Sequence, residues 1–491
     1  MKTGRKPLVP ERRQARAVMP GIFAGLLGAF LGLSLLKFGN PVIMEKWVTP
    51  PSDLYEFLLG YPWPIGWAYG LLVVVSLAGL FCFRRVPGGG VPRWLILLPA
   101  AWLVWEFLAG RQSVEPRLSH ETVRHFAACV ACFYLGFFSL SQAKNLLPFW
   151  LGLFCGFLVV LTVGLEQHFG GLEESRRYFF LYVYPRMTEP PPPEYLKKIS
   201  SSRIFSTLFY PNALAGALLL LLPAIFALLS VTRRMTTPAK AFLMGLIGLA
   251  AMACLYWSGS KGGWLLMLFL GLVAQLRLKF KPIYKAGLVM AVLVLGLSAF
   301  FWKYSGFFMR GATSVSARFD YWRAAAQTVR ERPVFGTGPG TFAIAYQRLK
   351  RPESEMSRMV HNDYLEQASD SGVMGCVLYT VFIVGALVWS FPRLECGAGP
   401  VREKGGRRRI DYEDDDEDEK DCMRRGWVVF TIWLGVLGWS LQGLFEFGLY
   451  IPVLAWTAFV FMGWLLAYVP ARLRAESGQP EIQSTKVQTN A

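Results

Sequence analysis

The sequence predicts an all-α polytopic membrane protein with about 12 transmembrane helices. Of its 491 residues, 54% are hydrophobic and only 17% are charged, and the mean hydropathy is +0.36. Soluble domains carry roughly 25% charged residues, so this composition excludes an ordinary soluble protein. A bilayer core about 30 Å thick requires ~20 apolar residues per helix, and backbone in lipid must satisfy its own hydrogen bonds. We therefore expect the apolar segments to form a helical bundle.

Twelve segments are apolar enough to be candidate spans. In chain order they are 19–38, 64–83, 94–109, 121–141, 146–166, 208–231, 241–258, 262–276, 286–302, 373–391, 426–447 and 451–469. No small-residue cleavage site follows the first span, so we expect it to remain a helix and not to be removed as a signal peptide. The third span contains Glu106 and the eleventh contains Glu446.

Basic residues are concentrated in alternate short loops, and this distribution orients the chain. The formal net charge is +18, and Lys and Arg gather in the N-terminal tail and in the loops around 84–93, 144, 233–240 and 277–285. Cytoplasmic loops of membrane proteins carry such an excess of positive charge. The pattern predicts that both termini are cytoplasmic. It also gives the positive charge a topological reason, which argues against a nucleic-acid partner.

Hydrophilic segments divide the chain into expected regions. These are a cytoplasmic basic tail (1–18), transmembrane helices 1–9 (19–302), a large outward loop (303–372), transmembrane helices 10–12 (373–469) and a cytoplasmic tail (470–491). A second outward loop, 167–207, contains the stiff stretch Pro190–Pro193. An inward loop, 392–425, carries an acidic run over 411–421. Such a run of like charge is typical of a solvated loop, which is how we interpret it.

The large outward loop has local signals for helices and a turn. Residues 317–331 place Phe319 and Trp322 along one face, which predicts a helix that Pro333 ends. Glycines at 336, 338 and 340 predict a turn.

A second helix is predicted to begin near the end of this loop. Asp363 is followed by Glu366 three residues later, which is typical of a helix cap. We expect this helix to run to about Asp370 and to stop at Gly372, near the start of the next span.

His361 is the candidate for proton transfer, because it is the only histidine in the large outward loop. An imidazole near the start of a helix lies at the positive end of the helix dipole, which favours the neutral form that a general base requires. The alternative is a loop histidine that only hydrogen-bonds to the backbone.

Three basic residues are candidates for binding an anion. Arg318 begins the helix predicted at 317–331, and Arg203 lies where the other outward loop re-enters the membrane. Guanidinium groups bind phosphate in a bidentate way and keep their charge, so two on one membrane face suit a diphosphate. Lys261 lies at the outer end of a span, where it faces an anion or merely extends to the interface.

Other features of this face have competing interpretations. The turn Gly336–Phe342 lacks the ending of a nucleotide-binding loop; its amides could hold an anion, but a structural turn is favoured. Glu446 is either a functional carboxylate inside the membrane or an interfacial one. The sequence contains no spacing of His, Cys, Asp and Glu that is typical of a metal site, so we expect no metal and no cofactor.

Three motifs resemble the O-antigen ligase and polymerase family of bacterial envelope proteins. They are Arg203-Ile-Phe-Ser-Thr-Leu-Phe-Tyr-Pro-Asn212, Arg318-Phe-Asp-Tyr-Trp322 with Pro333-Val-Phe-Gly-Thr-Gly-Pro-Gly340, and His361-Asn-Asp-Tyr-Leu-Glu366 with Ser371-Gly-Val-Met-Gly375. The order of the motifs and the large outward loop also fit. The motifs cover roughly 203–375, and the remainder matches only as a pattern of spans.

The resemblance implies a metal-independent, inverting glycosyltransferase with a GT-C-like helical fold in the bacterial inner membrane. Its active site would face the periplasm, and its donor would be a glycan on undecaprenyl diphosphate. Carried over to this sequence, Arg203 and Arg318 would stabilise the leaving diphosphate, and His361 would deprotonate the acceptor hydroxyl. The expected substrate-binding residues are Lys261, Asn212, Asn362, Tyr364, Gly338 and Gly340. Lys261 departs from the family, since many relatives have arginine there.

Several acceptors are compatible with these motifs. The leading prediction is a ligase that transfers the glycan to the lipid A-core of lipopolysaccharide. A polymerase that extends another lipid-linked repeat and a protein O-oligosaccharyltransferase share the same donor chemistry. A transporter of lipid-linked sugars would need charged residues along a path through the membrane, whereas the charged residues here lie at its outer boundary.

Overall fold

The computed structural model is helical throughout the residues it describes, which are 11–476 except 60–61, 84–89, 188, 192, 194–195, 197–198, 278–280, 310–312, 353 and 393–411. Residues 1–10 and 477–491 of the predicted tails and residues 393–411 of the inward loop lie outside the described residues. The acidic run at the end of that loop corrects the prediction, because from Tyr412 on it is not a loop but the first turns of a helix that continues into the eleventh predicted span. Within the described part, nine helices are long and apolar enough to cross a membrane. The fold class, an all-α polytopic membrane protein, is therefore confirmed.

Every predicted span coincides with a helix. The nine long apolar helices are α1 (Glu11–Lys37), α3 (Ile65–Cys82), α4 (Arg93–Arg111), α5 (Pro116–Tyr134), α6 (Leu147–Glu166), α9 (Pro211–Val231), α10 (Thr237–Ser258), α12 (Pro282–Met309) and α15 (Asp363–Trp389). The other three predicted spans correspond to α11 (Lys261–Leu276), α16 (Tyr412–Gln442) and α17 (Pro452–Glu476). That all of these helices cross the membrane, and that their arrangement is GT-C-like, stay predictions.

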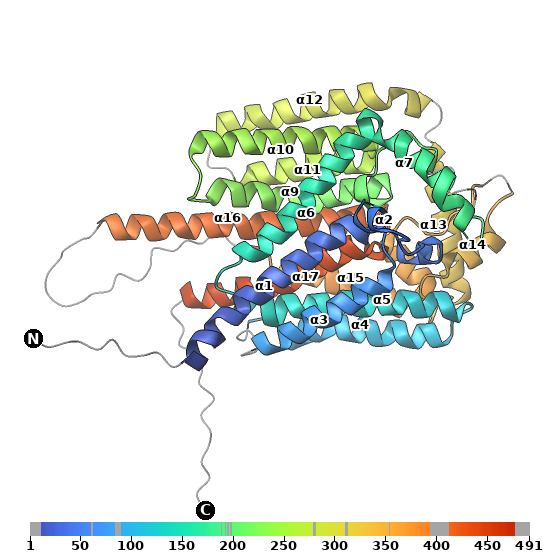
Figure 1. The fold of residues 1–491 in the computed structure, drawn as a ribbon, viewed down its shortest axis with the longest axis horizontal. Coiled ribbons are helices and arrows are strands. Elements are labelled where there is room, and N and C mark those ends of the chain that lie inside the picture. The colour runs from blue at the N-terminus through green and yellow to red at the C-terminus, as the bar shows by residue number, and fades with distance from the viewer. Residues whose placement is uncertain are drawn as a thin grey trace, which may run out of the picture.

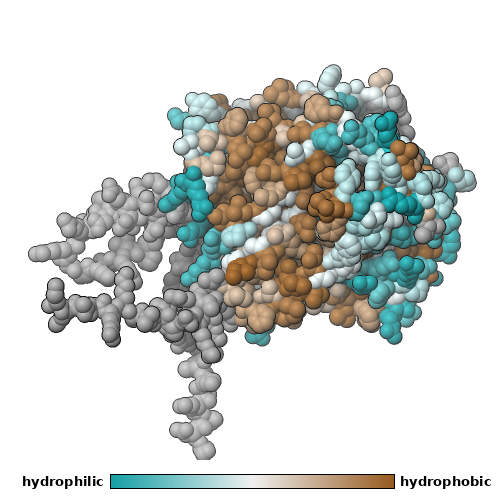
Figure 2. Space-filling view, in the orientation of Figure 1, coloured by the Kyte–Doolittle hydropathy of each residue, from teal (hydrophilic) through white to brown (hydrophobic). Residues whose placement is uncertain are grey.

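The long helices lie side by side in one bundle (Figure 1). Two short helices of the predicted outward loop, α13 (Thr313–Glu331) and α14 (Phe342–Leu349), gather at one end together with α2 (Leu54–Leu59) and α7 (Leu172–Tyr178). We call this the α13 end, and α1 begins and α17 ends at the opposite end. Figure 2 shows that hydrophobic side chains cover the middle of the visible face while hydrophilic ones gather toward the two ends, as a membrane-embedded bundle requires.

Small residues allow the central helices to approach closely. Gly28 and Gly32 of α1 face Gly152 and Gly156 of α6, and a Cβ atom on any of the four would collide with the backbone of the other helix. This Gly-x-x-x-Gly spacing on both partners is typical of packing between membrane helices. Helix α9 is buried along almost its whole length and packs against α16. The core therefore runs through α9, α16 and α17, and α9 and α17 begin, while α16 ends, near the candidate site.

The predicted helix and turn of the large outward loop are present. Helix α13 covers the predicted 317–331 and ends at Glu331, two residues before Pro333. Gly336, Gly338 and Gly340 all have positive φ angles, as the predicted turn requires.

One detail at the start of α15 corrects the prediction. The N-cap is Asn362 and not Asp363: the Asn362 Oδ1 atom accepts from the Leu365 amide at 3.0 Å, because Asn362 has extended backbone whereas Asp363 is already helical. The helix that begins there ends at Gly372 as predicted, since Gly372 has a non-helical φ of 74° and ψ of −179°, and a second helical segment of α15 follows directly. The Val373 amide donates to the Pro333 carbonyl at 2.9 Å, so this amide keeps a backbone partner at the break.

Candidate active site

A buried carboxylate, Glu446, lies at the α13 end among residues from five parts of the chain. It follows the end of α16 in the turn that leads to α17, and only 7% of its side chain is exposed. Its Oε1 atom accepts from the Arg318 guanidinium and from Asn212 Nδ2, the latter at 2.5 Å. Its Oε2 atom lies 3.3 Å from His361 Nδ1. We call Arg203, Asn212, Arg318, His361 and Glu446 the Glu446 cluster.

Arg203 joins the cluster through the start of α9. Its Nη2 atom donates to Asn212 Oδ1 at 2.8 Å, and its Nε atom donates to the Ser258 carbonyl at the end of α10 at 2.6 Å. Gly259 follows with a φ of 62°, and a Cβ atom there would press against the Arg203 side chain. Glycine at this position therefore leaves room for the guanidinium to reach the cluster.

Arg318 comes from the first turns of α13. Its Nε atom donates to the Phe445 carbonyl at 3.1 Å, while another nitrogen pairs with Glu446. Two anchors on one planar guanidinium fix its orientation, and 20% of the side chain remains exposed. The group is thus held in place but still reaches solvent.

His361 sits directly before α15 in a strained backbone conformation. Its φ is 55°, which is rare for a residue with a side chain. The ring stacks on Tyr321 at a centroid distance of 5.8 Å and meets the edge of Phe447 at 4.9 Å. These rings and Glu446 fix the imidazole plane, and 17% of the side chain is exposed.

Lys261 begins α11 beside the cluster. The guanidinium groups of Arg203 and Arg318 interact electrostatically with its ammonium group, which lies 5.2 Å from the centroid of the Tyr304 ring. Ser260 caps the helix by accepting from the Gly263 amide at 3.3 Å. The two arginines and this lysine outnumber the single carboxylate, so the cluster with Lys261 carries net positive charge and suits an anionic ligand.

The ionisation of Glu446 is consistent with these contacts. Burial raises the pKa of a carboxyl group, but the hydrogen bond from His361 and the charges of Arg318 and Arg203 lower it. The net result is a pKa below the ordinary value, so Glu446 is ionised at neutral pH.

Four of the expected substrate-binding residues make contacts within the protein, and a role for them in binding substrate stays a prediction. Asn362 caps α15, and the Tyr364 hydroxyl donates to the Ser440 carbonyl at 3.0 Å. The Gly338 amide donates to the Asp370 carbonyl at 2.8 Å, and the Gly340 amide donates to the Asp370 carboxylate at 2.7 Å. The glycine segment is therefore tied to α15 as a structural turn, the interpretation favoured by the sequence.

Glu446 itself was not among the expected site residues. The sequence shows a carboxylate near the end of an apolar segment, which fits an interfacial position equally well. Only the fold shows that it meets Arg318, more than a hundred residues earlier, and His361 at the start of α15. An acidic residue in a span of a protein that otherwise offers cationic candidates is the signal that sequence reasoning could have used.

Part of the sequence around the cluster matches a known protein family. Residues 245–380 match a family model described as O-antigen ligase. Over these residues the chain is similar to the O-antigen ligase family. The match confirms the family resemblance, and it spans Lys261, Arg318 and His361. Arg203, Asn212 and Glu446 lie outside the matched residues, and Glu446 contacts the matched Arg318 and His361 in the cluster.

Members of this family are glycosyltransferase-like ligases. No curated protein matches the sequence. Among the described residues, no three His, Cys, Asp or Glu side chains come together as a metal ion would require. That the reaction needs no metal and no cofactor stays a prediction.

Proposed function

We propose that this protein is a glycosyltransferase of the O-antigen ligase type. It would move a glycan from undecaprenyl diphosphate to an acceptor hydroxyl, with lipid A-core as the leading acceptor, at the periplasmic face of the bacterial inner membrane. The observation that carries the proposal is that the Arg318 guanidinium and the His361 imidazole meet on the buried Glu446 carboxylate at one end of the bundle. The guanidinium of Arg203 joins them through Asn212. The match to the O-antigen ligase family and the multi-pass fold support the proposal.

The cations are suited to the leaving group. When the bond between the anomeric carbon and the diphosphate oxygen breaks, that oxygen takes the electron pair and negative charge develops on it. Arg203 and Arg318, with Lys261 beside them, would bind the diphosphate and neutralise this charge. One preorganised donor of this kind contributes roughly 10²–10³ in rate. Because the arginines are already anchored by Asn212 and Phe445, little reorganisation accompanies the reaction.

His361 is suited to activating the acceptor. With its Nδ1 hydrogen donated to Glu446 Oε2, the neutral ring carries its lone pair on Nε2. Nε2 would take the proton from the acceptor hydroxyl as the oxygen attacks the anomeric carbon from the face opposite the diphosphate, which inverts the configuration. Glu446 holds the ring orientation and stabilises the imidazolium that forms. A base in this role contributes typically 10²–10⁴-fold.

The test is transfer by the purified full-length protein. Undecaprenyl-diphosphate-linked glycan and lipid A-core are supplied, and the glycosylated acceptor is measured. We expect His361→Ala to abolish transfer at an unchanged protein level, and the exposed His120→Ala on α5 to serve as the control with normal transfer. Near-normal transfer by His361→Ala would remove this residue from the mechanism.

The acceptor is decided by the surface glycans of a deletion strain. Loss of capped core with accumulation of lipid-linked polymer supports the ligase. Core capped by single repeats would indicate the polymerase, and loss of glycoprotein alone would indicate the protein O-oligosaccharyltransferase. Absence of transfer by the purified protein, with lipid-linked glycan retained on the inner side of the membrane in the strain, would instead favour a transporter.

A further inference from the structure

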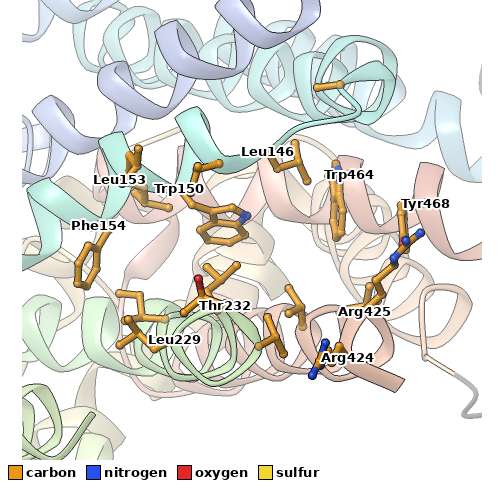
Figure 3. A pocket seen from close by; sticks show the side chains of 18 of the residues that line it. Leu146, Trp150, Leu153, Phe154, Leu229, Thr232, Arg424, Arg425, Trp464 and Tyr468 are labelled. Carbon is orange, nitrogen blue, oxygen red and sulfur yellow. The ribbon is translucent and has the colours of Figure 1, made fainter. Parts of the chain in front are cut away.

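A cavity of about 960 Å³ opens at the end of the bundle opposite the Glu446 cluster. It lies between α6, α9, α16 and α17 and belongs to no part of the site described above (Figure 3). The residues that line it fall into two groups, one apolar and one basic.

The apolar group forms the inner wall. Trp150, Leu153 and Phe154 come from α6, and Leu229 from α9 faces them across the cavity. The apolar lining from Leu147 to Phe154 extends about 10 Å along the axis of α6. A wall of this kind suits a hydrocarbon chain and offers little to a polar solute.

The basic group lies at the mouth. Lys144, Arg233, Arg424 and Arg425 line the cavity and are all exposed, and among the residues that the structure describes no Asp or Glu lines it. Figure 3 shows Arg424 and Arg425 near Tyr468 and Trp464 at one side, away from Phe154 and Leu153 at the other. The cavity thus passes from a cationic mouth to an apolar interior.

We propose that this cavity binds one bilayer phospholipid with an anionic headgroup. The phosphate would lie among the cations at the mouth, and an acyl chain would lie along Trp150, Leu153 and Phe154. Basic pockets between membrane helices on the cytoplasmic side bind such headgroups, and this is the end that the charge pattern predicts to be cytoplasmic.

The charge pattern alone does not place cations around a cavity. Arg234 and Lys281 also belong to loops at this end of the bundle, but neither lines the cavity. They therefore provide a matched control: two neutralisations at the same end, with the same change in net charge and no change in the lining.

The experiment measures lipid binding by the full-length protein after its lipids are exchanged for detergent. Phosphatidylglycerol and phosphatidylcholine with the same acyl chains are titrated, and bound lipid is counted by native mass spectrometry. We expect one phosphatidylglycerol to bind and phosphatidylcholine to bind more weakly. Lys144→Gln/Arg425→Gln should weaken phosphatidylglycerol binding by about tenfold, since each cation contributes to holding the headgroup. Arg234→Gln/Lys281→Gln should bind it normally.

A second variant tests the apolar wall. Leu229→Trp narrows the cavity without changing charge, and we expect it to weaken phosphatidylglycerol binding as well. Equal binding of the two lipids, an equal loss in both double variants, or displacement by millimolar inorganic phosphate with no effect of Leu229→Trp would overturn the proposal. Glycan transfer is not the readout, so the result does not depend on the proposed function.

Discussion

Replacing Glu446 with glutamine tests how the carboxylate sets the state of His361. The Glu446 Oε1 atom accepts from Arg318 and Asn212, so a glutamine is expected to keep its oxygen on that side. Its NH₂ group then faces His361 Nδ1, where the carboxylate oxygen had been. An amide that donates to Nδ1 moves the ring proton to Nε2, and the ring can no longer accept a proton from the acceptor.

The expected magnitude follows from the loss of the general base. We expect kcat to fall by about 10²–10⁴, which corresponds to roughly 3–5 kcal/mol of transition-state free energy. The KM for the donor should change little, because Arg318 keeps its bond to the Phe445 carbonyl and Arg203 keeps its bond to Ser258. The free energy of unfolding should fall by only about 1–3 kcal/mol, since glutamine preserves the volume and one acceptor.

The assay is steady-state transfer with purified variants, with thermal unfolding measured in parallel. Glu56→Gln is the matched control, because Glu56 also accepts from an arginine, Arg186 at 2.9 Å, at the α13 end without touching His361. Its kcat should be normal. A Glu446→Gln enzyme whose kcat lies within about threefold of the wild type would refute the argument that the carboxylate selects the tautomer.

Further outcomes follow from the same contacts. Arg318→Lys should lower kcat at least tenfold because lysine lacks the planar fork whose separate nitrogens donate to Phe445 and Glu446, whereas Arg323→Lys on the exposed side of α13 should be normal in the transfer assay. Gly32→Val should reduce thermal stability and yield, since its side chain would collide with the Gly152 backbone. Transfer should be unchanged in EDTA, and lost activity restored by Mg²⁺ would contradict this. Because the pKa of Glu446 lies below its ordinary value near 4.5, its stabilising contribution is present above that pH and fades below it. The difference in Tm between the wild type and Glu446→Gln should therefore shrink from pH 7 to pH 4.

The spans and the helix at 317–331 could be predicted because each is encoded locally. Apolar length defines the spans, and the apolar positions at Phe319 and Trp322 with the following Pro333 define α13. The pairing of elements is not local. The glycines predict a turn, but nothing in their sequence shows that the amides of Gly338 and Gly340 donate to Asp370, thirty residues after Gly340.

The cluster could be predicted only in part, for the same reason. Arg203, Arg318 and His361 belong to motifs, and their common membrane face follows from the charge pattern. Their common partner does not. Asp363 illustrates the limit: the sequence favours it as a cap, but its carboxylate instead accepts from the Leu449 amide at 3.0 Å and so fixes the turn that carries Glu446. At Asp363, beside the Glu446 cluster, a tertiary contact therefore replaces the helix cap that the local sequence favours.

The backbone strain of the described residues shows that the fold holds this site in advance of any substrate. Ser206, Phe209 and His361 are the non-glycine residues of that part of the chain with positive φ, and all three lie in or beside the motifs of the cluster. Each such conformation costs of order 1–3 kcal/mol and persists only where surrounding contacts enforce it. Ser206 shows how: its amide and hydroxyl are bound by Gln167 and by the Val160 carbonyl in the buried end of α6. The helical core thus maintains the strained backbone that places Arg203 on Asn212 and His361 on Glu446. Strained backbone held in this way favours a preorganised catalytic site over a flexible binding surface.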